Sequence, residues 1–216
     1  MSKLFLLGGG GHCKVVAAAA RRQGHVIVGA VDMDPAKLGQ VAEPGGAVVT
    51  WLQSAFFEHI QAHRALPDGA DACVLCVGNN THRMNALGQL GALVADAVVD
   101  PSAVIDSSSP VGRGTTVMPG VVVHPDATVG QGVILNTGCV VEHDCVVGQG
   151  VHLSPRATLC GGVSVGPQSW IGAGAVVLPG VSVGARVIVG AGAVVLRDLP
   201  DGVTAVGNPA RIIKRT

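Results

Sequence analysis

A six-residue period runs through the second half of the chain and constrains its fold more than any other feature. From residue 105 to residue 195, every sixth position holds Ile, Leu or Val without exception: Ile105, Val111, Val117, Val123, Val129, Leu135, Val141, Val147, Leu153, Leu159, Val165, Ile171, Val177, Val183, Val189 and Val195. Four residues after each of these comes a mostly small side chain, from Ser109 to Ala193. Neither an α-helix, with about 3.6 residues per turn, nor an ordinary two-residue strand repeat has this period.

A longer period of 18 residues is superimposed on the first, because glycines recur at that spacing at Gly112, Gly130, Gly148, Gly166 and Gly184. Three hexapeptides per turn predict a triangular coil with three short flat faces and a tight corner at each edge. The aliphatic residue points into the coil, the small residue fits where the coil narrows, and glycine and proline serve the corners. Residues 98–216 are therefore predicted to form a parallel β-helix, in which each rung is buried against its neighbours.

These hexapeptides resemble those of the left-handed β-helix acyltransferase superfamily, and the array runs without an insertion. The tail adds to the resemblance, since Gly207-Asn208-Pro209-Ala210-Arg211 after the last coil is a common ending in that superfamily. The resemblance implies a left-handed coil, an acyl group carried by coenzyme A, and a homotrimer.

Composition excludes several other classes of protein. The chain has 14 basic and 14 acidic residues, so no net charge favours binding to nucleic acid or to an anionic membrane. Residues 157–185 carry no charge, but Gly and Pro interrupt them at short intervals, which excludes a membrane helix. The six cysteines lack the spacing of a secreted disulfide framework and we see no signal peptide, so we expect free thiols and a cytoplasmic protein.

Residues 1–97 have a different sequence pattern, which predicts strands that alternate with helices. An apolar strand in KLFLLGGGGH (3–12) runs into a glycine loop and a helix, and HVIVGAVDMD (25–34) is a second strand that ends in acidic residues. A third strand in DACVLCVGNN (71–80) precedes a helical THRMNALGQL (81–90). This order predicts an α/β domain with a small parallel, Rossmann-like sheet. Ligands bind beyond the carboxyl ends of such strands, where Gly8 to His12, Asp32 and Gly78 fall.

The glycine loop matches a dinucleotide fingerprint only in part. Gly8 and Gly10 are spaced as its first two glycines and Asp32 follows at the expected distance, but Cys13 stands where the third glycine is required. A strand, loop and helix of this kind still cradle a phosphate through loop amides and the helix dipole. We therefore expect a nucleotide other than NAD; the alternative is a glycine turn with a helix-capping acid.

The GGGGH loop, the VDMD strand end and the VGNN turn, ahead of hexapeptides, resemble bacterial sugar acetyltransferases of the sialic-acid O-acetyltransferase type. The pattern is closest to the perosamine and bacillosamine-pathway group, which N-acetylates nucleotide-linked amino-dideoxy sugars for surface polysaccharide or glycan synthesis. The resemblance implies substrate contacts at Gly10, Gly11, His12, Asp32 and Gly78. The second acid that often follows the first is replaced here by Met33, with Asp34 one residue further on, so the contacts to base and ribose stay open.

The run Glu142-His143-Asp144 stands out in a stretch built from Val, Gly and small residues. In the hexapeptide register Val141 points inward, so His143 and Asp144 fall on a corner and are not needed to fill the core. Acetyl transfer to a sugar amine needs a base, and a neutral imidazole beside a carboxylate suits that role. An E-H-(E/D) run at this rung contains the base in the resembled family. The resemblance therefore implies His143 as the base and Asp144 as its partner, with Glu142 as the spare.

Four further residues are implied as contacts to acetyl-CoA: His152, Gly161, Ala173 and Ala191. The co-substrate is expected in the groove between two β-helices of a trimer, held by backbone groups at corners where side chains are small. His152 lies on an outward position off the corner of His143. It is expected to complete a site in its own or a neighbouring subunit; the alternative is an ordinary face residue.

The expected reaction is acetyl-CoA-dependent N-acetylation of the 4-amino group of a GDP- or UDP-linked amino-dideoxy sugar. A sugar O-acetyltransferase would use the same base, and a non-catalytic, nucleotide-binding trimeric scaffold is a third hypothesis. The sequence does not distinguish GDP, UDP and CMP. No metal is expected, because His124, His143 and His152 lack the close histidine pair of the zinc sites known on this fold. Cys73 and Cys76 are expected to be packed core thiols.

Overall fold

A computed structural model describes residues 1–215, and the chain divides into two compact units, Met1–Pro101 and Ser102–Thr216. None of the helices within residues 1–215 has the length and apolar character that a bilayer crossing requires. The α/β domain and the β-helix that the sequence predicts are both present.

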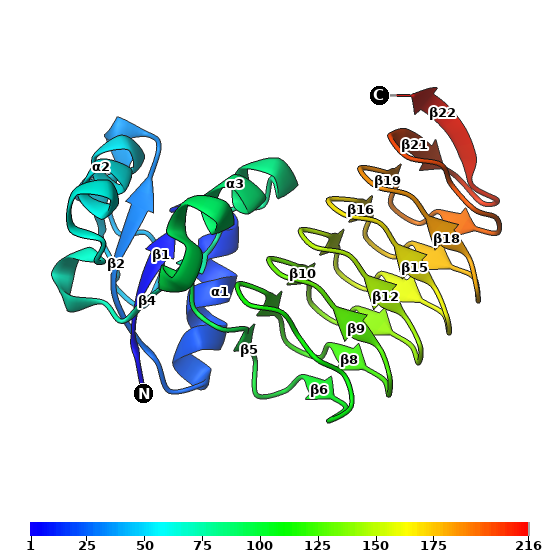
Figure 1. Ribbon diagram of the computed structural model, residues 1–216, viewed down its shortest axis with the longest axis horizontal. Coiled ribbons are helices and arrows are strands. Elements are labelled where there is room, and N and C mark those ends of the chain that lie inside the picture. The colour runs from blue at the N-terminus through cyan, green and yellow to red at the C-terminus, as the bar shows by residue number, and fades with distance from the viewer. Residues whose placement is uncertain (216) are drawn as a thin grey trace. The chain divides into compact units, whose positions relative to one another are not determined.

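The first unit alternates strands with helices (Figure 1). Its strands are β1 (Lys3–Leu7), β2 (Val26–Asp32), β3 (Val49–Leu52), β4 (Ala72–Leu75) and β5 (Val98–Val99). Its helices are α1 (Gly11–Arg22), α2 (Gln53–His63) and α3 (Asn80–Leu90), with short 3-10 turns η1 (Pro35–Lys37), η2 (Pro67–Gly69) and η3 (Gly91–Leu93). Four strands form a parallel sheet in the order β3-β2-β1-β4. β3 and α2 were not predicted from the sequence.

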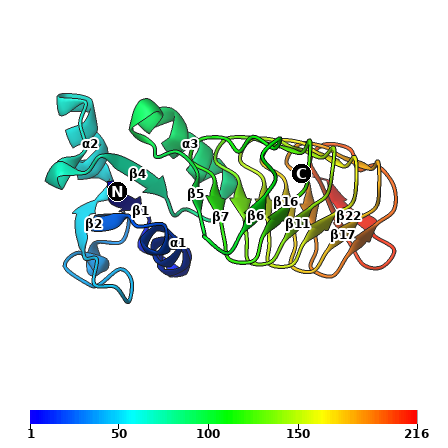
Figure 2. The ribbon, with the colours of Figure 1, turned by 90° about the horizontal axis from the view of Figure 1, so that it is seen from below.

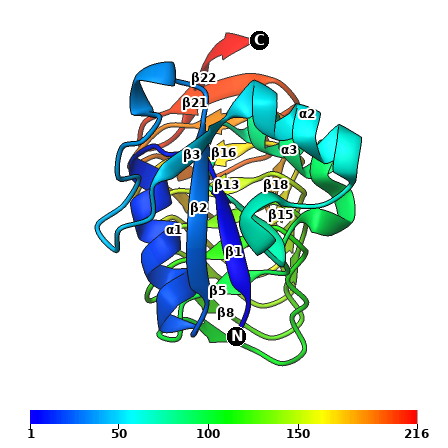
Figure 3. The same cartoon turned by 90° about the vertical axis from the view of Figure 1, so that its left-hand side faces the viewer.

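Helices cover both faces of this sheet, with α1 on one side and α2 and α3 on the other (Figure 3). The core forms because β1 buries Leu4 to Leu7 and because Phe5 stacks on Phe56 of α2 with ring centroids 5.6 Å apart. Both side chains are fully buried. The carboxyl ends of β1, β2 and β4 therefore open on the same edge, next to the glycine loop and the first turn of α3.

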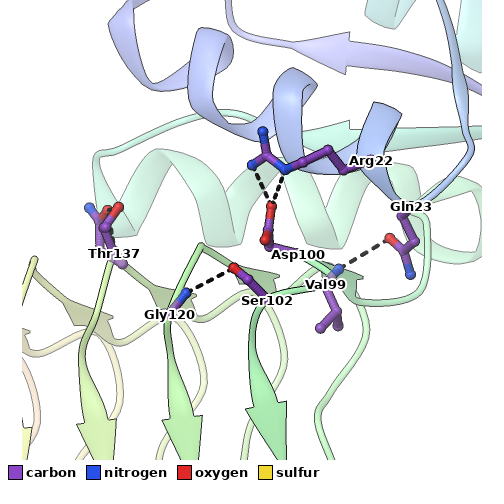
Figure 4. Close-up of polar contacts among 8 residues, drawn as sticks. Arg22, Gln23, Val99, Asp100, Ser102, Gly120 and Thr137 are labelled. Atoms are coloured by element: carbon purple, nitrogen blue, oxygen red, sulfur yellow. Dashed lines mark hydrogen bonds and ion pairs between the residues drawn. The ribbon is translucent and has the colours of Figure 1, made fainter.

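The last segment of the first unit is fixed to the end of α1 (Figure 4). Arg22 Nε donates to Asp100 Oδ2 at 2.7 Å, and Arg22 Nη2 bonds the same oxygen. The backbone N–H of Val99 donates to Gln23 Oε1 at 3.2 Å. Asp100 is buried, so these polar contacts satisfy a carboxylate that has left solvent.

The second unit is a parallel β-helix of two-residue strands (Figures 1 and 2). The strands are β6 (Val104–Ile105), β7 (Thr116–Val117), β8 (Val122–Val123), β9 (Thr128–Val129), β10 (Ile134–Leu135), β11 (Val140–Val141), β12 (Val146–Val147), β13 (His152–Leu153), β14 (Thr158–Leu159), β15 (Ser164–Val165), β16 (Trp170–Ile171), β17 (Val176–Val177), β18 (Ser182–Val183), β19 (Ile188–Val189) and β20 (Val194–Val195). One face holds β6-β8-β11-β14-β17-β20, a second β9-β12-β15-β18, and a third runs from β7 through β10, β13, β16 and β19 to β21 (Val203–Val206). There β22 (Arg211–Arg215) pairs antiparallel with β21.

The six-residue period predicted the interior of this unit correctly. Every period residue from Val117 to Val195 is only 0–3% exposed, and strand partners lie 18 residues apart, as in the pairing of Val141 with Leu159. Only the first two period residues, Ile105 and Val111, are partly exposed. Buried aliphatic side chains thus stack from rung to rung and fill the core. The residue types at the corners can therefore differ from rung to rung.

We call one of these edges the histidine corner; it consists of Pro125, His143, Gly161 and Pro179 with the residue that follows each. Its backbone is tied from rung to rung, because the N–H of Gly162 donates to the carbonyl of His143 at 2.9 Å and that of Gly180 to Gly161 at 3.0 Å. The second residue of the turn takes a positive φ, +70° at Gly162 and 59° at Asp144. Aspartate is one of the residues that tolerates this conformation.

Candidate active site

His143 and Asp144 lie side by side on the histidine corner, between β11 and β12. His143 Nδ1 is 2.7 Å from Asp144 Oδ2, and the two side chains are 62% and 66% exposed. The N–H of Asp144 donates to the carbonyl of Pro125 at 3.2 Å, which fixes the carboxylate beside the ring. With Nδ1–H bonded to a carboxylate, the lone pair is on Nε2, which is the nitrogen that can accept a proton.

The electrostatic surroundings of His143 favour its protonated form. The hydrogen bond to Asp144 raises the pKa of the imidazole, and the negative charges of Asp144 and Glu142 act in the same direction. Desolvation acts in the opposite direction, but the hydrogen bond to Asp144 is the larger effect and the net shift of the pKa is upward. The imidazole therefore keeps its proton to a higher pH than a free histidine does.

Glu142 does not share the role of Asp144 in this structure. Its Oε1 is 3.6 Å from His124 Nε2, one rung earlier on the same column. Glu142 therefore contacts the neighbouring histidine, and Asp144 is the carboxylate bonded to His143.

The residues predicted to contact acetyl-CoA fall in three places. Gly161 lies on the histidine corner, next to the imidazole of His143. Ala173 and Ala191 stack on another corner, where the N–H of Gly192 donates to the carbonyl of Ala173 at 2.8 Å. His152 lies on the third face, within β13.

His152 is held there by two neighbours. Asn136 Nδ2 is 3.2 Å from His152 Nε2, and the ring of Trp170 stacks on the imidazole at a centroid distance of 5.6 Å with planes 3° apart. Trp170 Nε1 in turn donates to Ser154 Oγ at 2.7 Å. His152 and His143 thus belong to different surfaces of one β-helix.

The α/β unit contains a cavity of about 430 Å³ at the carboxyl edge of its sheet. Of the residues predicted to bind substrate, Gly10, Asp32 and Gly78 line it, whereas Gly11 and His12 are not among its lining residues. Gly10 is the N-cap of α1 and has no side chain to cap the helix; the N–H of Cys13 donates to the carbonyl of Gly10 at 3.1 Å, and the amides of Gly11 and His12 are the ones a ligand could use. A cavity of this size suits part of a nucleotide-sized ligand.

Asp32 organises the loops at the mouth of β2. Its Oδ2 accepts from the N–H of Gly9 and from Lys37 Nζ, both at 2.9 Å, and its Oδ1 accepts from the N–H of Asp34 at 2.9 Å. Burial works to raise the pKa of Asp32, but the hydrogen bonds from Asp34, Lys37 and Gly9 together lower it. The carboxylate is therefore ionised and binds the loop, in addition to facing the cavity.

His12 is held in the neutral form. Burial and the nearby charge of Arg83 lower its pKa to about 4, and its Nε2 is shielded from solvent without a hydrogen-bond partner among residues 1–215. Arg83 is fully buried and donates to the carbonyls of Val77 and Gly78 at 3.0 and 3.1 Å.

Several cavity residues were not predicted from the sequence, namely Lys37, Gln53, Phe57, His82, Asn85 and Gln89. Lys37 lies on η1, shortly after Asp32, and a basic residue so close to a strand-end acid is a signal visible in the sequence. Gln53 and Phe57 come from α2, which was not predicted from the sequence. Residues 1–215 contain no cluster of three or more His, Cys, Asp or Glu side chains able to hold a metal ion.

Comparison with known proteins identifies both units. The PglD N-terminal domain family matches residues 3–90, and the bacterial transferase hexapeptide family (six repeats) matches residues 162–197. No curated protein sequence matched the chain.

Solved structures match over nearly the whole chain. PerB from Caulobacter crescentus, solved with CoA and GDP-perosamine, is 38% identical with a TM-score of 0.88, covering 99% of this chain and 98% of that one. The acetyltransferase domain of PglB from Neisseria gonorrhoeae is 35% identical with a TM-score of 0.87, covering 99% and 100%. WeeI from Acinetobacter baumannii is 26% identical with a TM-score of 0.83, covering 99% and 100%.

These matches confirm the resemblance that the hexapeptides and the glycine loop predicted. The identity to PerB and PglB extends through both units, so it concerns the combination of an α/β unit with a β-helix and not the repeat alone. The chain belongs to the family of left-handed β-helix sugar N-acetyltransferases that includes PerB and the acetyltransferase domain of PglB.

Proposed function

We propose that this protein transfers the acetyl group of acetyl-CoA to the 4-amino group of a nucleotide-linked amino-dideoxy sugar, with His143 as the general base. The observation that carries the proposal is the His143–Asp144 pair, an exposed imidazole whose Nδ1 is 2.7 Å from a carboxylate. The ligands of PerB, CoA and GDP-perosamine, support the choice of substrates. PerB was also solved with the same two ligands after a histidine was replaced by asparagine or by alanine.

His143 and Asp144 supply proton transfer in this reaction. The amine nitrogen attacks the thioester carbon, the new C–N bond forms, and a proton passes from nitrogen to His143 Nε2. The C–S bond then breaks, and the imidazolium returns the proton to the sulfur of coenzyme A. Asp144 stabilises the imidazolium between these steps through its bond to Nδ1.

The α/β unit is proposed to hold the nucleotide-sugar. Gly10 and Gly78 line the cavity and are proposed as direct contacts, and Gly11 and His12 are proposed to contribute backbone N–H groups from the first turn of α1. His12 contributes its amide because its imidazole is largely buried. Asp32 is proposed to bind the substrate while it orders the Gly9 loop.

Acetyl-CoA is proposed to bind along the β-helix, against Gly161, Ala173, Ala191 and His152. The two alanines have small side chains and the glycine has none, so a bound coenzyme A could approach the backbone groups at these corners. Because His152 and His143 lie on different surfaces, we propose a homotrimer in which the neighbouring β-helix contributes to each site. We further propose a cytoplasmic location, which the six unpaired cysteines support.

A substrate panel tests the proposal. Wild-type protein is incubated with acetyl-CoA and, separately, GDP-perosamine, a UDP-linked 4-amino-4,6-dideoxy sugar and a nucleotide-linked sugar with a 4-hydroxyl in place of the amine. Thiol release and the mass of the product are followed. We expect one amino sugar to be acetylated on nitrogen and the hydroxyl sugar to be left unchanged. Acetylation of the hydroxyl sugar alone would establish an O-acetyltransferase, and no acetylation of any acceptor would favour the scaffold.

A further inference from the structure

Gly161 lies one rung beyond His143 on the histidine corner, and the imidazole occupies the space where a side chain of residue 161 would begin. A Cβ placed on Gly161 would come within 2.6 Å of both Cε1 and Nε2 of His143 and within 3.3 Å of Cδ2. Carbon atoms in contact prefer about 3.5–4.0 Å. No side chain therefore fits at residue 161 while the ring keeps its place.

Backbone conformation does not explain this glycine. Gly161 is not among the glycines with positive φ, whereas Gly162 beside it has a φ of +70°. Other rungs carry proline at the equivalent position, Pro125 before and Pro179 after. This position of the corner therefore has room for a ring in the rungs of Pro125, His143 and Pro179. In the rung directly after His143 the same position holds glycine, which has no side chain.

We propose that Gly161 is a positioning residue for His143: by lacking a side chain, it provides the place in which the imidazole keeps Nδ1 on Asp144 and Nε2 accessible. This inference rests on the proposed function, in which His143 is the base. It adds a role for Gly161 that is separate from the proposed contact with acetyl-CoA.

The rest of the corner is fixed, so an added methyl group displaces the ring and not the chain. Gly162 donates to the carbonyl of His143 at 2.9 Å, and Gly180 donates to the carbonyl of Gly161 at 3.0 Å. The His143 side chain is 62% exposed and its Nδ1 is bonded to Asp144. Because that bond is the main cause of the raised pKa of His143, displacement of the ring lowers this pKa toward its ordinary value.

The test compares Gly161→Ala with Asp144→Asn, and with Pro179→Ala as the matched control on the next rung. Protein labelled at histidine is titrated by NMR without substrate, with the His143 signal assigned by its loss in His143→Ala. In Gly161→Ala we expect the pKa of His143 to fall as it does in Asp144→Asn. We also expect kcat to fall by about 10- to 100-fold with the acidic limb of its pH profile moved to lower pH. Pro179→Ala should match the wild type in both measurements.

A Gly161→Ala protein with the wild-type pKa of His143 and the wild-type kcat would overturn the inference, and so would a shifted pKa with an unchanged kcat. Where Gly161→Ala folds poorly, the double variant Gly161→Ala, His143→Ala decides. If the ring is the obstacle, that variant is as stable as His143→Ala alone; if it is less stable, the inference is wrong. The titration needs no acetyl transfer, so failure of the wild type to acetylate any sugar refutes the proposed function and leaves this test intact.

Discussion

The two units of the chain place a histidine in opposite surroundings. On the β-helix, His143 is exposed, and its bond to Asp144 raises the pKa of the imidazole. In the α/β unit, burial and the charge of Arg83 lower the pKa of His12 to about 4. The first ring keeps its proton to a higher pH than a free histidine does, and the second is neutral at pH 7. The corner of the solenoid thus presents an exposed imidazole paired with a carboxylate, and the α/β unit holds a largely buried, uncharged imidazole in the first turn of α1.

The largest expected effect of this difference between the two histidines is on how the free energy of unfolding depends on pH. His12 is neutral in the folded state and titrates at its ordinary pKa of 6.5 when unfolded, so the folded state loses stability as pH falls from 6.5 toward about 4. The loss attributable to His12 is about 3 kcal/mol. His143 acts with the opposite sign, because its raised pKa adds stability below 6.5 that disappears as pH rises through the folded value.

Urea unfolding of wild type and His12→Gln from pH 7.5 to pH 4 measures the first effect. The difference in unfolding free energy between the two proteins should shift against the wild type by about 3 kcal/mol over this range. Other titrating groups cancel in the difference. A difference that does not change with pH would show that His12 is not held neutral in the folded protein.

A smaller effect, on substrate binding, is expected from Asp32→Asn. This substitution tests the role of the α/β unit. The substitution removes the charge that pairs with Lys37 and one of the oxygens that fix the Gly9 loop. The KM for the nucleotide-sugar should rise by roughly tenfold, with kcat and the KM for acetyl-CoA nearly unchanged.

Asp34→Asn is the matched control for this measurement. Asp34 is two residues away, exposed, and caps η1 by accepting from the N–H of Ala36 at 2.9 Å. Its substitution should leave all three constants close to those of the wild type. A fall in kcat alone in Asp32→Asn would contradict a role for Asp32 in binding the nucleotide-sugar.

The β-helix was more predictable from sequence than the α/β unit, for a physical reason. Each rung repeats one environment, so the register that buries Val141 also places His143 on a corner, and both predictions are confirmed. The expectation that glycine and proline serve the corners held only in part, because Asp144 takes the positive φ beside His143. Asp144 both takes this turn conformation and bonds the imidazole of His143. The repeat pattern alone cannot distinguish such a residue from an ordinary turn residue.

The cavity of the α/β unit is lined by residues from segments far apart in the sequence, and no local sequence pattern shows that these segments meet. Lys37 comes from η1, Gln53 and Phe57 from α2, and Gln89 from α3, and they meet only through the packing of the sheet. β3 and α2 were not predicted, because the strand ends at Leu52 and the helix begins at Gln53 with no Gly, Pro or Asn to mark the boundary. The placement of His12 also depends on Arg83, whose burial follows from tertiary packing and not from its neighbours in sequence.

Chemical rescue tests the central claim, that His143 is the base of acetyl transfer, most directly. Single-turnover acetylation of the accepted amino sugar is measured in wild type and in His143→Ala, with and without added imidazole. The account predicts a fall of about 10²–10⁴-fold in His143→Ala, and partial recovery in proportion to the neutral imidazole present, because the corner is open to solvent. A His143→Ala protein that acetylates at the wild-type rate without imidazole would contradict the account.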